Sequence, residues 1–540
     1  MKKNVSRFIA AFLAAAMSTG SLAYLPEGSA DILPKVFTAN AEDLTEGDFT
    51  YVENDSGVTL TKYTGSDEAV TIPATLGGKP VTAIGSDAFY ANGAVKSLKM
   101  PETITSIGRN ALKLCSNLSD IKLHEGITSI GSEAFNSVAV TEITIPSTLT
   151  SCENQFYNCK ALKKVTFPDG MTAIPEGCLK NATGLETVVV PDSVVSIGSE
   201  AFYNCGSLKE FPFHEGITTI NYLAFYLTGL EEITLPSTLT YCDKAFDGSA
   251  VNKVTFAKGI EKIPNATMYG AEELAAVILP DTVTNIGEDA FNYCKSLTSI
   301  DLPEGITTLG NVAFSHSGLQ EVTLPSTLTS CRAFYECTLK KVTFADGMVT
   351  IPYNCMDDAY MLEEAVLPDS VKKIDSYAFQ SCKALKTINL PEGLEELGGE
   401  SFKYCSSLKS LKLPETLKSA GSSVFRDAGL EEVTIPASLT NTNHTFADSR
   451  VKKATFAEGT VNIPHNIFSR ASYLTDVILP STVKTIGSES FMEASSLKTI
   501  TLPEGLELID GRAFEKSGLR SIVIPDSVTE IKNFAFQNCT

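Results

Sequence analysis

The sequence predicts an α/β solenoid in which about twenty short repeats stack, each contributing one strand to a parallel β-sheet. A phrase of the type Leu-x-x-(Ile/Val)-x-(Leu/Ile/Phe)-Pro recurs every 20 to 23 residues along nearly the whole chain. Within each repeat the apolar residues keep a fixed set of positions. The phrase ends at Pro101, Pro146, Pro168, Pro191, Pro236, Pro280, Pro303, Pro325, Pro368, Pro391, Pro414, Pro436, Pro480, Pro503 and Pro525, and its proline is replaced by His124, His214, Ala257, Ala345 and Ala457.

The repeat from Leu185 to Cys205 shows the plan, and we number its positions 1 to 21. Positions 3 to 6 alternate between polar or outward and apolar residues, which is typical of a strand with one buried face. Pro191 at position 7 lacks an N–H and ends the strand. Gly198 at position 14 is expected to relax the backbone for a turn, and Ala201-Phe202 to lie in a short helical or extended return segment. The remaining apolar positions are 1, 10, 13 and 21, and stacking in a curved or superhelical array would bury them all.

A second, longer period overlies the first. Ile-Pro occurs within the repeat at Ile174-Pro175, Ile263-Pro264, Ile351-Pro352 and Ile463-Pro464, with offsets of 89, 88 and 112 residues. The first two offsets equal four repeats and the last equals five. We interpret this as duplication of a four-repeat unit, with one extra repeat near Pro414 in the third copy.

Residues 1–41 are predicted to be a signal peptide and leader. A basic start is followed by the apolar run Phe8–Met17, which is too short to span a bilayer. Small-residue cleavage sites lie near Ala23 and Ala41. We therefore expect a secreted or cell-surface protein with no transmembrane span in the mature chain.

Residues 42–80 are predicted to form an N-terminal β-hairpin cap and a degenerate first repeat that ends at Pro73. Two strands, Phe49–Glu53 and Val58–Lys62, flank the turn sequence Asn-Asp-Ser-Gly. A solenoid needs a cover over its first core face. The repeat array fills residues 81–540 and stops in mid-repeat, so we expect the natural protein to continue beyond Thr540.

The composition limits the possible partners. The formal charge of −21 argues against nucleic acid or an anionic membrane surface, since both require clustered Lys and Arg. Trp is absent, which excludes a sugar-binding platform of indole rings. We expect a monomer whose partner is an extracellular protein or a cell-surface or polysaccharide ligand.

The repeat resembles the BspA-like class of bacterial leucine-rich repeats. The pattern I-x-I-P-x-S-V-x-x-I-G-x-x-A-F-x-x-C-x-x-L is matched nearly position for position by Pro191 to Leu208 and by Pro280 to Leu297. The resemblance covers about residues 65 to 540. It implies a secreted or surface-attached protein, since some members of the class bind host extracellular-matrix proteins or mediate adhesion.

Thirteen cysteines in an exported protein first suggest disulfides. Each one, however, occupies a position that the repeat pattern assigns to the core, so we predict buried free thiols. Cys115, Cys159, Cys205, Cys294, Cys337, Cys382, Cys405 and Cys539 take position 21, Cys152, Cys242 and Cys331 replace the Ile of position 13, and Cys178 and Cys355 replace the Ala of position 17.

Catalytic and metal-binding motifs are missing from the sequence. There is no HExxH, Gly-x-Ser-x-Gly, phosphate loop, EF-hand or CxxC, and the five His residues are scattered. The acidic turns such as Pro303-Glu304-Gly305 are more simply solvated loops than calcium sites. We therefore predict no catalytic residues, no metal and no cofactor.

The outward strand positions are the candidate ligand-binding residues. At position 3, Glu and Lys alternate on neighbouring repeats, where attraction across strands contributes a few tenths of a kcal/mol. At position 5, a Val or Ile is exposed on the next repeat of each block. A stable sheet accounts for these features more simply than a ligand site does, because β-branched residues and matched charges favour strand pairing. The predicted residues are Glu142, Lys164, Glu232, Lys253, Glu321, Lys341, Glu432, Lys453, Val189, Ile278, Val366 and Ile478.

Two functions follow from these features. The first is a non-catalytic extracellular binding or adhesion protein that uses its sheet face. The alternative is a structural spacer or scaffold that carries a C-terminal module, such as an enzyme, a glycan-binding domain or a docking domain.

Overall fold

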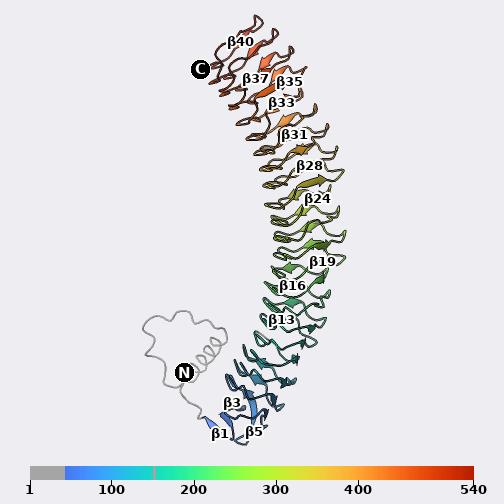
Figure 1. The fold of residues 1–540 in the computed structure, drawn as a ribbon, viewed down its shortest axis with the longest axis vertical. Helices are drawn as coiled ribbons and strands as arrows, with labels where there is room; N and C mark the ends of the chain where they lie inside the picture. The colour runs from blue at the N-terminus through green and yellow to red at the C-terminus, as the bar shows by residue number, and fades with distance from the viewer. Residues whose placement is uncertain (1–42, 150–153, 540) are drawn as a thin grey trace, which may run out of the picture.

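The chain forms one long, curved stack of coils, which runs from the blue N-terminal end to the red C-terminal end in Figure 1. The computed structural model describes residues 43–149 and 154–539. The predicted signal peptide and leader lie outside these residues. Apart from the N-terminal strands β1–β3 and β5, every pairing joins parallel strands of neighbouring coils, so the architecture is a parallel β-solenoid.

Positions 3 to 6 form the predicted strand, and these strands make what we call the first sheet. It is divided into runs of three or four strands. Its strands are β4 (Ala69–Thr71), β7 (Ser97–Lys99), β9 (Asp120–Ile121), β11 (Glu142–Thr144), β12 (Lys164–Thr166), β14 (Thr187–Val189), β17 (Glu232–Leu235), β19 (Lys253–Phe256), β21 (Ala276–Ile278), β24 (Glu321–Leu324), β26 (Lys341–Phe344), β28 (Glu364–Val366), β30 (Thr387–Ile388), β33 (Glu432–Ile435), β35 (Lys453–Phe456) and β37 (Asp476–Ile478).

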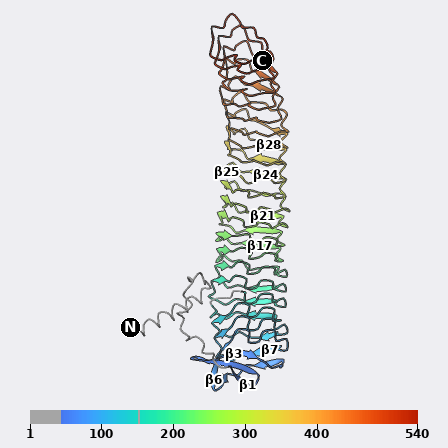
Figure 2. The same ribbon diagram turned by 90° about the vertical axis from the view of Figure 1, so that its left-hand side faces the viewer.

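Positions 12 and 13 form a second strand that the sequence analysis missed, so the expectation of one strand per repeat is wrong. These strands, each of two residues except the six-residue β6, make a second sheet along the other edge of the stack. Figure 2 shows the two edges, with β25 on the second sheet and β24 on the first. They are β6 (Lys79–Ile84), β8 (Ser106–Ile107), β10 (Ser129–Ile130), β13 (Ala173–Ile174), β15 (Ser196–Ile197), β16 (Thr219–Ile220), β18 (Tyr241–Cys242), β20 (Lys262–Ile263), β22 (Asn285–Ile286), β23 (Thr308–Leu309), β25 (Ser330–Cys331), β27 (Thr350–Ile351), β29 (Lys373–Ile374), β31 (Glu396–Leu397), β32 (Ser419–Ala420), β34 (Asn441–Thr442), β36 (Asn462–Ile463), β38 (Thr485–Ile486), β39 (Leu508–Ile509) and β40 (Glu530–Ile531).

The return segment, positions 15 to 21, consists of turns, and no helix occurs among the described residues. Two residues of nearly every described return segment are left-handed: Glu200 at position 16 has φ 54° and Asn204 at position 20 has φ 57°. A left-handed residue at every fourth position is incompatible with a helix. The α of the predicted α/β class is therefore not supported, and in the same residues no segment has the helical length and apolarity to cross a bilayer.

A hairpin is present at the N-terminal end, where the sequence predicted one. β2 (Phe49–Asn54) and β3 (Gly57–Tyr63) are antiparallel, and β3 continues into the second sheet by parallel pairing with β6. Tyr51 and Leu60 are buried. That the hairpin acts as a cap stays a prediction. Two more short strands complete this end, β1 (Leu44–Glu46) and β5 (Thr75–Leu76).

The core is one continuous apolar column that runs through all the coils. The predicted inward positions of the repeat Leu185–Cys205 are buried, except that Val190 is only partly covered. Position 18 stacks phenylalanine rings from coil to coil: Phe225 lies 5.2 Å from Phe202 and 5.4 Å from Phe246, nearly parallel to both. The core therefore couples each coil mainly to its two neighbours.

Gly198 is needed for a close approach between coils rather than for a special turn conformation. Its φ is outside the left-handed region, and a Cβ there would lie 2.6 Å from the backbone N of Glu176 and 2.7 Å from the carbonyl carbon of Pro175. The predicted reason for this glycine, a relaxed turn, is therefore wrong. At position 14 the backbones of two neighbouring coils are in direct contact.

Replacing Gly198 with alanine is expected to destabilise the chain by roughly 1–3 kcal/mol, because the added methyl forces the two coils apart. Gly206 in the same coil is the control, since a Cβ there would meet nothing within 4 Å. Urea denaturation followed by circular dichroism should show a lower midpoint for G198A and an unchanged one for G206A. Equal midpoints for the two variants would contradict the close-approach account.

The Ile-Pro repeats interrupt the second sheet. In a regular coil the N–H of position 14 donates to the position-13 carbonyl of the preceding coil, as Gly198 does to Ile174 at 2.7 Å. Pro264 has no N–H to donate, and the sheet is broken there between β18 and β20. The same break falls between β25 and β27 and between β34 and β36, at Pro352 and Pro464. The longer period thus has a structural effect beyond its duplication history.

Candidate ligand-binding face

The candidate residues lie on the outward side of the first sheet, which we call the first-sheet face. Strand pairing places each predicted Glu directly beside its predicted Lys on the next coil. The four register pairs are Glu142 with Lys164, Glu232 with Lys253, Glu321 with Lys341, and Glu432 with Lys453.

Not every neighbouring pair is an ion pair. Lys253 Nζ lies 2.9 Å from Glu232 Oε2, but the corresponding distance from Lys453 to Glu432 is 3.9 Å. Lys341 pairs instead with Glu364 on the following coil, at 3.2 Å. These side chains are exposed, so each pair contributes little to stability. A ligand could therefore replace one partner of such an ion pair with little loss of stability.

Three of the four predicted apolar residues lie where runs of the first sheet end. Val189, Ile278 and Ile478 are 42%, 48% and 49% exposed, on the last strands β14, β21 and β37 of their runs. Val366 on β28 is half-buried, because one further strand, β30, follows it. Each of the other three is a single exposed apolar side chain, and its register neighbour is a threonine: Thr166, Thr255 and Thr455.

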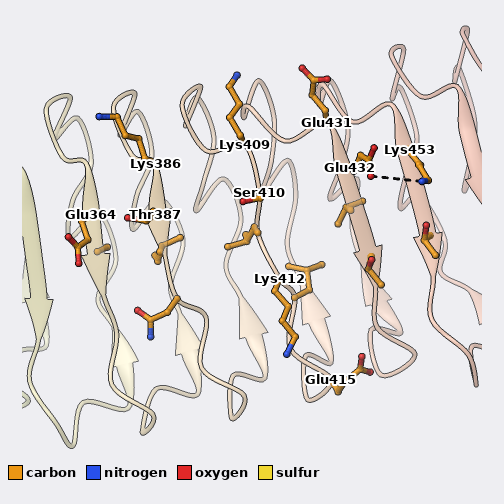
Figure 3. Close-up of a pocket in the computed structure, with 18 of the residues that line it drawn as sticks. Glu364, Lys386, Thr387, Lys409, Ser410, Lys412, Glu415, Glu431, Glu432 and Lys453 are labelled. Carbon is orange, nitrogen blue, oxygen red and sulfur yellow. Dashed lines mark ion pairs between the residues drawn. The ribbon is translucent and has the colours of Figure 1, made fainter.

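A groove of about 1000 Å³ opens on this face where the first sheet is interrupted between β30 and β33. Figure 3 shows its rim lysines Lys386 and Lys409 on adjacent coils, with Ser410 and Lys412 further down the same coil as Lys409. The interrupting segment, residues 409–413, belongs to the extra repeat of the third block and contains no strand. The sequence located this repeat but gave no sign of the groove.

The acidic turns link neighbouring coils through hydrogen bonds. Glu215 Oε2 accepts hydrogen bonds from the backbone N–H and the hydroxyl of Ser237 on the next coil, at 3.1 and 2.6 Å. Glu125 binds Ser147, and Glu304 binds Ser326, in the same way. Among the residues that the structure describes, no group of three or more His, Cys, Asp or Glu side chains is arranged to hold a metal ion. These carboxylates therefore link turns.

The thiols lie in the core. Of the twelve cysteines in the described ranges, eleven are buried, Cys539 is partly exposed, and none is in a disulfide; Cys152 lies outside those ranges. At position 21, Cys159 donates its S–H to the Phe135 carbonyl of the preceding coil, with Sγ and O 3.0 Å apart. Burial raises the pKa of Cys159 to about 12 and that of Cys115 to about 11. Such thiols are poor nucleophiles.

A match to a family model shows which protein family the chain belongs to. The BspA type leucine-rich repeat region matches in six copies, over residues 68–155, 140–245, 240–332, 330–450 and 442–540. The chain belongs to this family. The resemblance seen in the sequence is thereby confirmed, and the coils are BspA-type leucine-rich repeats.

Solved structures of other bacterial repeat proteins are similar to this BspA-type chain. A leucine-rich repeat protein from Bacteroides ovatus is 20% identical, with 81% of this chain and 100% of that chain covered and a TM-score of 0.48. A leucine rich cell surface protein from Faecalibacterium prausnitzii is 24% identical (81% and 94% covered, TM-score 0.28), and the pneumococcal vaccine antigen PcpA is 15% identical (90% and 99% covered, TM-score 0.27). A comparison with curated proteins found no match.

One carboxyl of the BspA-type array lies away from the first-sheet face and titrates unusually. Asp357, in a return segment, has its pKa raised to about 6, first by burial and then by the neighbouring Asp358 carboxylate. Arg332 opposes the shift, as does the Gln380 amide, whose Nε2 lies 3.2 Å from Asp357 Oδ1. Because the pKa is higher in the folded chain than its ordinary value of 3.8, the stability that comes from protonation is complete below about 3.8 and is lost as the pH rises through about 6.

Replacing Asp357 with asparagine should therefore raise the urea midpoint at neutral pH, where the wild-type carboxylate is charged and half-buried. At about pH 4 the variant should gain little, since the wild-type carboxyl is then mostly protonated. The exposed Asp120→Asn variant, measured in the same way at both pH values, is the control. A gain for D357N that is equal at both pH values would show that the effect is not one of titration.

Proposed function

We propose that this BspA-type chain is a non-catalytic extracellular binding or adhesion protein, secreted or held at the cell surface. Its first-sheet face would contact an extracellular protein or a cell-surface polysaccharide. The observation that carries the proposal is the exposed Val189, Ile278 and Ile478 at the ends of sheet runs, each on the strand next to one that carries a lysine at position 3. The family match supports it, because leucine-rich repeats are binding scaffolds in general.

The face suits binding more than catalysis. Its apolar side chains can be buried by a partner with a gain of roughly 25 cal/mol per Å². Its Glu and Lys side chains are weakly paired and can exchange partners. The described thiols are in the core rather than on this face, apart from the partly exposed Cys539 at the C-terminal end.

The test is binding of the full chain to immobilised extracellular-matrix proteins, cultured host cells and polysaccharides. A first-sheet variant carries serine at Glu142, Lys164, Glu232, Lys253, Val189 and Ile278. We expect it to lose at least tenfold in affinity while its urea midpoint stays within a small margin of the wild type, because all six side chains are on the surface. Unchanged binding would contradict the proposal.

A matched control uses the opposite edge of the stack. Val195, Val349 and Val461 at position 11 are also exposed, and Lys373 pairs with Glu396 at 3.2 Å on the second sheet. Serine at these five positions removes three exposed apolar and two charged side chains, yet should leave binding intact. If only this variant lost binding, the binding site would be on the second sheet and not on the first.

One observation favours a spacer as the second candidate. The coils form a single elongated stack with a continuous core, which is the shape of an arm that holds another module away from a surface (Figure 1). In that case both serine variants would behave like the wild type in every binding assay.

A further inference from the structure

The groove on the first-sheet face has a bare stretch of backbone at its centre. Residues 409–413 make no backbone hydrogen bonds to either neighbouring coil within the described part of the chain. Unpaired N–H and C=O groups are costly unless water or a partner satisfies them. The main chain of an extended peptide offers donors and acceptors in the right alternation, as in strand addition to a sheet.

The floor of the groove is apolar and open. Ile388 and Leu411 occupy position 4, which normally faces the core, and both are only half-buried. The same bare backbone recurs at residues 299–302 and 499–502, where the equivalent Ile300 and Ile500 are buried, and at 521–524 near the C-terminal end, where Ile522 is also half-buried. The extra repeat therefore combines free backbone groups with exposed apolar surface.

The rim holds one lysine without an ion-pair partner in the described part of the chain. Along position 2, Lys386 lies 2.5 Å from Glu363, and Glu431 lies 2.8 Å from Lys452, so these charges are paired with coils outside the groove. Lys409 stands between Lys386 and Glu431 and forms no ion pair with any described residue. Its charge acts on Glu431 only at longer range, because the pKa of that carboxyl is lowered first by Lys452 and then by Lys409. The hydroxyls of Ser410, below Lys409, and of Thr387, on the coil of Lys386, make no hydrogen bonds to described residues. Lys409 can therefore bind an anionic group at the rim of the groove.

We propose that this groove binds an extended peptide segment that carries a carboxylate next to an apolar side chain. The carboxylate pairs with Lys409, the apolar side chain covers Ile388 and Leu411, and the peptide main chain bonds to residues 409–413. This inference rests on the proposed function, and it names the partner class and its place on the first-sheet face. A sulfated polysaccharide would use Lys409 but not the apolar floor, so the structure favours the peptide.

The experiment selects binders from a phage-displayed library of random 12-residue peptides on the full chain, and measures them by fluorescence anisotropy. We expect enrichment of sequences with Asp or Glu beside Leu, Ile, Val or Phe. Binding should fall at least tenfold in K409E and in S410W, whose indole would fill the groove. Both substitutions are at exposed positions, so the variants should fold. K498E is the control, because Lys498 holds the same position in the equivalent strandless coil.

Failure to enrich peptides, enrichment of peptides without acidic residues, or equal binding to K409E and wild type would overturn the inference. So would heparin binding that is lost in K409E and that acidic peptides do not displace. The first-sheet serine variant leaves every groove residue intact. If matrix or cell binding is lost in that variant while no peptide is selected, only this inference fails. If neither matrix, cells nor peptides bind, the proposed function fails too.

Discussion

Replacing Phe225 with alanine is expected to cost about 3–5 kcal/mol, the largest loss of any single substitution considered for this chain. Phe225 is fully buried and its ring contacts four others: Phe202 and Phe246 in the stack, and Phe211 and Phe213 from the side, at 4.9 and 5.4 Å. The methyl that remains would leave a cavity bounded by three coils. Because coils are coupled mainly to their neighbours, the array should then unfold in two steps rather than one.

Urea denaturation followed by circular dichroism measures this loss, and hydrogen exchange should locate it in the coils on either side of Phe225. Tyr222→Ala is the matched control, since Tyr222 lies in the same coil and is 47% exposed. We expect its midpoint to change little. If the two variants lost the same stability, the ring stack would not be the element that couples the coils.

The second large effect concerns the thiols. Burial raises the pKa of Cys159 and of Cys242 to about 12, against an ordinary value of 9.0, so at about pH 8 the thiolate fraction is roughly a thousandfold lower than in an unfolded chain. A disulfide reagent should therefore react with the native protein very slowly. Cys539, which is partly exposed, should be the first of the described thiols to react.

In concentrated urea the same reagent should titrate all thirteen thiols. Mass spectrometry of the modified peptides identifies which cysteine reacts first in the native protein. A count well below thirteen would reveal disulfides. Rapid native reaction at Cys205 would show that position 21 is not closed to solvent.

The sequence predicted those parts of the structure that follow from a regular alternation of apolar and polar residues. The apolar alternation at positions 3 to 6 identified the first sheet, and the register of Glu232 with Lys253 followed from it directly. The second sheet was missed because Ser196 and Ile197 form a strand of only two residues, which is too short to show an alternation. The turns of the return segment were also missed, because left-handed residues there are as varied as Glu200 and Leu223.

The candidate site was only partly predictable for a similar reason. The exposure of Val189 and Ile278 follows from their outward position in a strand. The half-burial of Val366 does not, because it depends on the additional pairing of β28 with β30. The groove depends on the strandless stretch at residues 409–413, whose local sequence closely resembles that of neighbouring coils. Interruptions of this kind arise from the packing of coils on one another.

Lysine footprinting of the full chain, with and without a bound extracellular partner, tests the central claim most directly. Lys164 and Lys253 lie on the first sheet, and Lys262 and Lys373 are their counterparts on the second. If the first-sheet face is the binding surface, the partner should protect Lys164 and Lys253 from acetylation and leave Lys262 and Lys373 as reactive as in the free chain. Protection of Lys262 and Lys373 alone would contradict the account.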